Sequence, residues 1–258
     1  MRVFQFTGLW LFVWLAAMPL NAVGESEQPG LAGYGGVDSK AGEGLRLRSF
    51  GNFKRMVHQR NSAGVVKLNG LVNNKGVYAL GAIAGGLGEI TVINGEVWLD
   101  YGSDGPGNSV HQPGAESAVL MVMATVKAWH QLELPAAMSF PELQAFVLLA
   151  AENLNLDIKK PFAFQVNGVF SRLDMHVIDG INSDFGGHGR GHLYKMHPFT
   201  RQHQPAAVIG FYSADQQGVY THMGSSWHLH GVLADDDIGG HVESLVVEQG
   251  SLLLLPKL

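Results

Sequence analysis

Cysteine is absent from the 258 residues of this sequence. Its absence excludes disulfides, thiolate metal sites and cysteine nucleophiles, so any transition metal must bind through histidine, aspartate or glutamate. Charged residues are also scarce, at 15% of the chain, and the formal net charge of −5 leaves no basic excess. Because nucleic acids and anionic lipids bind to basic surfaces, this balance argues against both as partners and favours a small-molecule ligand.

Apolar residues, glycine and histidine are plentiful. Hydrophobic residues make up 46% of the chain, which is enough to form a substantial core and argues against intrinsic disorder. The 34 glycines follow no collagen-like period and are typical of tight turns between strands. Histidine has the most unusual distribution, because nine of the 12 histidines lie between residues 176 and 241.

Residues 1–24 have the layout of a cleavable signal peptide: Arg2, an apolar run over residues 8–18, and small residues at 22–24. The run is shorter than the ~20 apolar residues that a spanning helix requires. We therefore expect cleavage near Ala22 or Gly24, no stable membrane insertion after processing, and a periplasmic or secreted protein. Residues 25–44 are rich in Gly, Ser and Glu, which predicts a flexible lead-in.

The remaining sequence predicts an α+β, β-rich fold with few helices, built from mixed or antiparallel sheets. We divide it into an N-terminal α/β half at 45–160 and a barrel-like, β-rich C-terminal half at 161–258 that carries a metal site. A capping box at Ser139 and Glu142 begins a helix that extends to Asn153, and a short helix is expected over 53–61. Strand patterns cover 65–68, 77–80, 89–93, 96–99, 117–126, 162–166, 169–176, 207–212, 227–233 and 241–247.

Two Asn-Gly pairs separate strand patterns, at Asn94-Gly95 and at Asn167-Gly168. This dipeptide accepts the positive φ of a type I′ turn, so each pair predicts a hairpin. The shared pattern leaves open whether the two halves are built on one plan. Residues 181–204 are polar and rich in glycine and histidine, which favours a long loop over a functional face.

The strongest chemical signal is the H-x-H at His228 and His230. Side chains at i and i+2 of a strand share a face, and the polar turn at 235–240 would bring His241 to the same side if the flanking strands pair. Three neutral imidazoles suit an open catalytic zinc site. The alternative is that the H-x-H lines a solvent-facing strand and His241 is a turn residue. Asp235–Asp237 lack the closing Glu of a calcium loop and predict a solvated turn.

The 181–204 segment offers a competing metal site. Its histidines are numerous enough to bind metal in their own right: His188, His192, His197 and His203. A His-rich metal-binding protein without turnover is therefore an alternative function, as is a different metal-assisted lyase on the same scaffold. Imidazole alone does not select among zinc, copper, nickel and iron. The sequence leaves the oligomeric state open, with a homodimer among the possibilities.

Several segments resemble the zinc-dependent α-acetolactate decarboxylases. The final stretch, residues 208–212 followed by His228-Leu229-His230, an acidic turn and Gly239-Gly240-His241, resembles that family most specifically. Gly86-Leu87-Gly88-Glu89 and the segment 161–170 resemble it as well. The resemblance implies that His228, His230 and His241 bind zinc, and that Glu89 reaches the active site.

The sequence departs from that family in two places. Family members carry an arginine where the nearest alignment puts His176, with Arg172 four residues earlier. A guanidinium holds a carboxylate bidentately, whereas an imidazole does not. Members also have a longer tail that returns a glutamate to the metal; here 17 residues follow His241, and Glu243 and Glu248 are the late carboxylates, with Glu243 on the His241 face by strand alternation.

The resemblance implies decarboxylation of α-acetolactate, a 2-hydroxy-3-oxo acid, to acetoin. Loss of carbon dioxide leaves an electron pair that must move into the ketone oxygen, and a zinc ion would serve as Lewis acid and template. A glutamate whose pKa is raised by burial suits the following proton transfer. We expect Glu89 to be this acid and His176 or Arg172 to orient the substrate; on sequence alone, Glu89 is also compatible with an exposed charge at a strand start.

Overall fold

The computed structural model describes residues 37–40, 45–185 and 193–258. The signal peptide expected at 1–24 lies outside these residues and stays a prediction. Part of the expected flexible lead-in is ordered, because β1 (Val37–Lys40) pairs with β2 (Leu45–Phe50). In the described part of the chain, no helix combines the length and apolar character needed to cross a membrane.

The first half of the chain forms one antiparallel sheet. Its strand order is β1-β2-β7-β4-β5-β6, and β3 pairs with β7. Its remaining strands are β3 (Val66–Lys67), β4 (Val77–Ile83), β5 (Gly88–Ile93), β6 (Glu96–Tyr101) and β7 (Ser117–Val126). Short helical turns join some of them: η1 (Lys54–His58), η2 (Ala84–Gly86) and η3 (Gly102–Asp104).

The second half forms another antiparallel sheet, which closes on itself. The order is β8-β15-β10-β12-β13-β14-β9, with β11 also paired to β10. The long strand β10 pairs with β12 along its first part and with β14 along its second, so β10, β12, β13 and β14 form a closed ring. The elements are β8 (Trp129–Glu133), β9 (Met138–Ser139), α1 (Phe140–Asn153), β10 (Phe162–Ile181), β11 (Tyr194–Arg201), β12 (Gln204–Tyr212), β13 (Trp227–Leu233), η4 (Ala234–Asp236), β14 (Ile238–Val247) and β15 (Leu252–Pro256).

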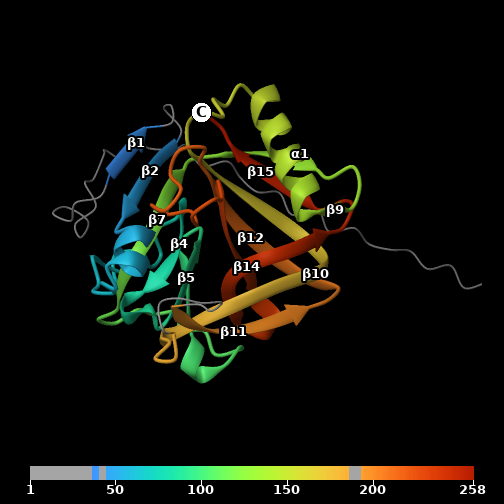
Figure 1. Ribbon diagram of the computed structural model, residues 1–258. Coiled ribbons are helices and arrows are strands. Elements are labelled where there is room, and N and C mark those ends of the chain that lie inside the picture. Colours follow the sequence, from blue (N-terminus) through green and yellow to red (C-terminus); the bar gives the residue numbers. More distant parts are fainter. Residues whose placement is uncertain (1–36, 41–44, 186–192) are drawn as a thin grey trace, which may run out of the picture.

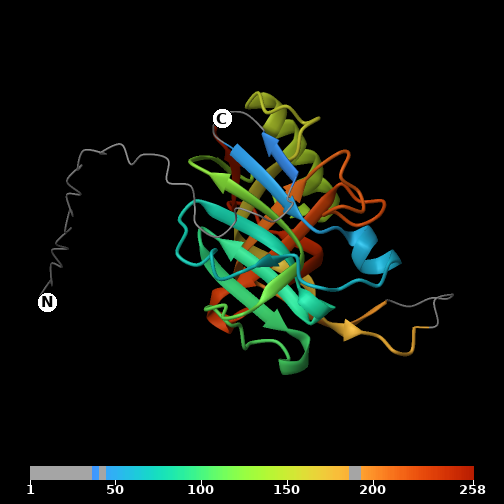
Figure 2. The ribbon, with the colours of Figure 1, turned by 90° about the vertical axis from the view of Figure 1, so that its left-hand side faces the viewer.

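The two sheets pack against each other, and α1 lies beside the second one (Figure 1). Strands β5 and β6 of the first sheet contact β10 and β14 of the second. Figure 2 shows the first sheet in front, with the yellow-to-red strands of the second behind it. The change of sheet falls between β7 and β8, so the division that we placed at residue 160 does not coincide with it.

Several local predictions are confirmed. Asn94 and Gly95 have φ values of 54° and 82° in the turn between β5 and β6, as a type I′ hairpin requires. The helix begins after Ser139, whose backbone N–H donates to Glu142 Oε2 at 2.8 Å. The structure is β-rich with few helices, as expected, and its strand pairs are antiparallel.

Two local predictions are wrong. Asn167 and Gly168 form no turn; they lie within β10, opposite Ala207 and Ala206 of β12. The glycine is required there because a Cβ would collide with the Ser251 side chain, rather than because of a positive φ. The expected loop at 181–204 contains strand β11, which pairs antiparallel with β10.

Candidate metal centre

The β13–β14 hairpin brings the three predicted histidines together. His230 lies directly opposite His241 in the strand register, and His228 precedes His230 by two residues on the same strand. The ring centroid of His228 lies 5.1 Å from that of His230 and 5.0 Å from that of His241. The ring centroids of His230 and His241 are 5.5 Å apart. All three side chains are buried, which excludes the alternative of a solvent-facing H-x-H.

Two further histidines join this cluster. His176 of β10 is the register partner of His241 on the other side of β14, with ring centroids 4.8 Å apart. His222, in the connection between β12 and β13, has its ring 4.9 Å from that of His241 and 5.6 Å from that of His228. The sequence reasoning missed His222, because it follows no strand periodicity; its only signal is its position six residues before His228.

Two groups of residues could each hold a metal ion, because the possible ligand atoms within each group lie within 4.8 Å of one another. The groups are His222, His228 and His241, and His176, His241 and Glu243. His230 adjoins both sets. Its Nδ1 is 3.1 Å from Thr91 Oγ1, and its Nε2 is buried without a hydrogen-bond partner among the described residues. A nitrogen of this kind suits a metal ion.

The protonation of these rings also fits a metal. His228 Nδ1 donates to the Tyr220 carbonyl at 2.6 Å, which leaves its Nε2 as the nitrogen with the lone pair. Burial, followed by the nearby histidines, holds the pKa values of His228 and His241 well below the ordinary range, and burial lowers the pKa of His230 to about 3. Neutral imidazole is the form that binds metal, so these residues fit zinc or a similar divalent ion.

Glu89 of β5 reaches this cluster from the other sheet. The side chain is buried rather than exposed, with Oε2 3.6 Å from His230 Nε2 and Oε1 3.9 Å from His176 Nε2. Burial raises the pKa of the Glu89 carboxyl to about 7, although nearby His176 acts in the opposite direction. A carboxyl of this kind can hold or release a proton near neutral pH.

Two other candidate residues, Glu243 of β14 and Arg172 of β10, differ in whether they reach the cluster. Glu243 points toward the cluster as strand alternation predicts, with Oε1 2.9 Å from His176 Nδ1. Arg172, which we expected beside the substrate, is exposed and binds Asp174 at 2.8 Å. His176 lies four residues further along β10 and is buried, so the same strand carries one candidate outside the cluster and one within it.

The competing metal site in the 181–204 segment is not formed by the two of its histidines that the structure describes. His197 lies 3.2 Å from Asp179, and His203 lies 3.1 Å from Glu248, both on exposed surfaces. Neither belongs to a group of possible metal ligands within the described residues. His188 and His192 lie outside the described residues.

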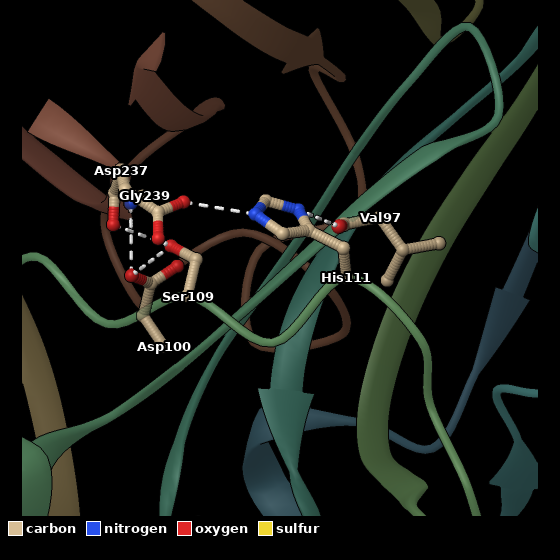
Figure 3. Close-up of polar contacts among 6 residues, drawn as sticks. All are labelled: Val97, Asp100, Ser109, His111, Asp237 and Gly239. Carbon is tan, nitrogen blue, oxygen red and sulfur yellow. Dashed lines mark hydrogen bonds and ion pairs between the residues drawn. The ribbon is translucent and has the colours of Figure 1, made fainter. Parts of the chain in front are cut away.

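A polar network connects the turn of the β13–β14 hairpin to the first sheet (Figure 3). Asp100 of β6 accepts a hydrogen bond from the backbone N–H of Gly239 at 2.9 Å and another from Ser109 Oγ at 2.7 Å. A Cβ on Gly239 would lie 2.6 Å from Asp100 Oδ2, so glycine permits the close approach of the two sheets. The network fixes β14 two residues before His241.

The same network continues through His111. Its Nδ1 donates to the Val97 carbonyl of β6 at 2.9 Å, and its Nε2 lies 2.8 Å from Asp237 Oδ1 (Figure 3). Asp237 is at the hairpin turn, where it has a φ of 52°. The turn between β13 and β14 is thereby attached to the first sheet at two points.

We expect Asp100→Ala to loosen this attachment. The change leaves the buried Gly239 N–H without its acceptor, which should lower the free energy of unfolding by about 1–3 kcal/mol and reduce the melting temperature by several degrees. Differential scanning calorimetry would measure the change. Asp104→Ala is the matched control, because the Asp104 carboxylate is exposed and accepts a hydrogen bond from neighbouring Ser103 rather than from the hairpin turn. Equal melting temperatures for the two variants would contradict the role of the network.

The histidine cluster lies in the wall of a cavity of about 700 Å³. Its polar lining includes His176, His222, His228, His241, Glu89 and Glu243, together with His58 and Arg60. The remaining wall is largely apolar and includes Phe53, Met56, Leu120 and Ile178. A cavity with convergent polar groups at one side of an apolar wall is typical of a small-molecule site.

Comparison with known proteins identifies the family. The sequence profile described as Alpha-acetolactate decarboxylase matches residues 56–255. This chain belongs to the alpha-acetolactate decarboxylase family. The match covers strands β3 to β7 of the first sheet and almost all of the second, and therefore Glu89 and the histidine cluster together. No curated protein matches the chain.

Solved structures of this family share the fold. The alpha-acetolactate decarboxylase of Bacillus subtilis strain 168 superposes with a TM-score of 0.57 at 18% identity, over 77% of this chain and 80% of that chain. The acetolactate decarboxylase of Bacillus subtilis subspecies spizizenii gives 0.58 at 16%, over 77% and 81%. A Staphylococcus aureus protein similar to alpha-acetolactate decarboxylase gives 0.55 at 15%, over 76% and 79%.

Proposed function

We propose that this protein decarboxylates α-acetolactate, or a closely related 2-hydroxy-3-oxo acid, with a divalent metal held by His228, His230 and His241. The observation that carries the proposal is the buried Glu89 carboxyl, 3.6 Å from His230 Nε2, beside a cluster of neutral imidazoles. Membership of the alpha-acetolactate decarboxylase family supports this reaction over other metal-assisted chemistry.

The chain's own residues supply the protein groups that the reaction needs. The three imidazoles would hold the metal, which supplies Lewis-acid polarisation of the substrate oxygens when bound. The apolar wall of the cavity takes the methyl groups of the substrate and limits the access of water. After carbon dioxide leaves, Glu89 donates its proton to the carbon that carried the carboxylate, and the substrate's electron pair forms the new C–H bond.

His176 occupies the place at which the family resemblance puts an arginine. Its ring lines the cavity between Glu89 and Glu243, 3.9 Å and 2.9 Å away. A single imidazole nitrogen offers a carboxylate one donor, whereas a guanidinium offers two in a fixed plane. We therefore propose that His176 positions the substrate and that it does so less tightly than an arginine would.

Acetoin formation by the purified protein tests this function. We expect racemic acetolactate to yield acetoin when zinc is bound, and the rate to fall to background after treatment with a chelator and to recover when zinc is restored. Elemental analysis would measure the metal in the same samples. Full metal occupancy without acetoin would contradict the decarboxylase proposal and favour the metal-binding alternative.

A further inference from the structure

His222 lies within metal-ligand reach of two histidines that the proposed function already uses. The possible ligand atoms of His222, His228 and His241 are all within 4.8 Å of one another. Nitrogens bound tetrahedrally to one zinc ion lie about 3.4 Å apart, given Zn–N distances near 2.05 Å. The difference between 4.8 Å and about 3.4 Å is small enough to be closed by rotation of an exposed side chain. His222 is the exposed member of this set.

The backbone around His222 is held in place. The Thr221 carbonyl accepts from the Gly218 N–H at 2.8 Å, and the His222 carbonyl accepts from the Ser225 N–H at 3.0 Å. The His222 ring also packs on Phe53, with centroids 4.5 Å apart. These contacts keep the imidazole against the cavity wall, so little conformational entropy is lost if it binds a metal.

We propose that His222 is an additional ligand of the metal centre. The proposal rests on the proposed metal site at His228, His230 and His241, and it adds a fourth imidazole supplied by a connecting segment rather than by the hairpin. His222 approaches from the cavity side, whereas His230 is buried between the two sheets. The metal would therefore be enclosed by imidazoles from both directions.

Metal affinity measures the contribution of His222 directly. Replacing a residue that only hydrogen-bonds to a metal ligand typically lowers metal affinity by about 10- to 100-fold. We therefore expect His222→Ala, which removes a ligand, to weaken zinc binding by at least this factor. Competition with a chromophoric chelator would measure the change. His203→Ala is the matched control, because His203 is exposed and contacts Glu248 away from the cluster. Circular dichroism would confirm that both variants fold.

A cysteine at this position provides a spectroscopic test. The natural chain has no cysteine, so His222→Cys introduces the sole thiol. If residue 222 binds the metal, the cobalt-substituted variant should show a thiolate-to-cobalt charge-transfer band in the near ultraviolet. Met223→Cys places the thiol on the exposed neighbouring residue and should show no such band.

The two experiments separate this inference from the proposed function. Wild-type zinc affinity in His222→Ala, together with no charge-transfer band in His222→Cys, would overturn the role of His222 while leaving the hairpin site intact. A wild-type protein that binds neither zinc nor cobalt would overturn both. Weakened binding in His222→Ala and the band in His222→Cys would support the additional ligand whatever the catalytic rate.

Discussion

Glu89→Gln is expected to lower acetolactate turnover by roughly 10²- to 10⁴-fold, the usual contribution of a positioned general acid. Glutamine has nearly the same shape but carries no transferable proton. Metal content should be unchanged, because Glu89 is not among the proposed imidazole ligands. Steady-state acetoin formation and elemental analysis of the same preparation would measure both quantities.

The pH dependence of folding gives this variant a second readout. Burial raises the pKa of Glu89 to about 7, from an ordinary value of 4.5. In the metal-free protein, the stability that this bound proton contributes is present below pH 4.5 and is lost as the pH rises to about 7. Glutamine does not ionise. As the pH rises from 4.5 to 8, the free energy of unfolding of Glu89→Gln should therefore increase by about 3 kcal/mol relative to that of the wild type.

Glu96→Gln is the control for both measurements. Glu96 is an exposed carboxyl on the neighbouring strand β6, so its replacement should change neither turnover nor the pH dependence of unfolding. Unchanged turnover in Glu89→Gln would contradict the role of this residue as proton donor. Loss of metal in Glu89→Gln would instead indicate that the carboxylate binds the ion.

His230→Gln is expected to weaken metal binding by roughly 10²- to 10³-fold, because binding energies of about 10–16 kcal/mol are shared among about four ligands. Glutamine fills much of the space of the fully buried ring, which limits damage to the fold. Acetoin formation should fall with the bound metal. Equilibrium dialysis against zinc would measure the affinity.

The histidines of the 181–204 segment provide the complementary variant. Replacement by alanine at four positions should leave metal occupancy at the wild-type level: His188, His192, His197 and His203. If this variant were empty while His230→Gln kept its metal, the assignment would move from the hairpin to that segment.

Local sequence was enough to predict much of the hairpin that carries the histidines. Alternation along a strand put His228 and His230 on one face, and the acidic turn placed His241 opposite them, because these features depend on residues close together in the chain. The hairpin turn at Asn94-Gly95 and the capped helix after Ser139 were predictable for the same reason. The family resemblance also rested on such short segments.

Tertiary structure decided the rest of the site. Asn167-Gly168 remained in an extended strand, since pairing with β12 outweighed the turn preference of the dipeptide. The burial of Glu89 required the second sheet to cover β5, and the packing of β10 left Arg172 exposed while it buried His176. His222 reached the cluster from a connecting segment. Burial, register shifts and contacts between distant segments depend on how the two sheets pack, which local periodicity does not encode.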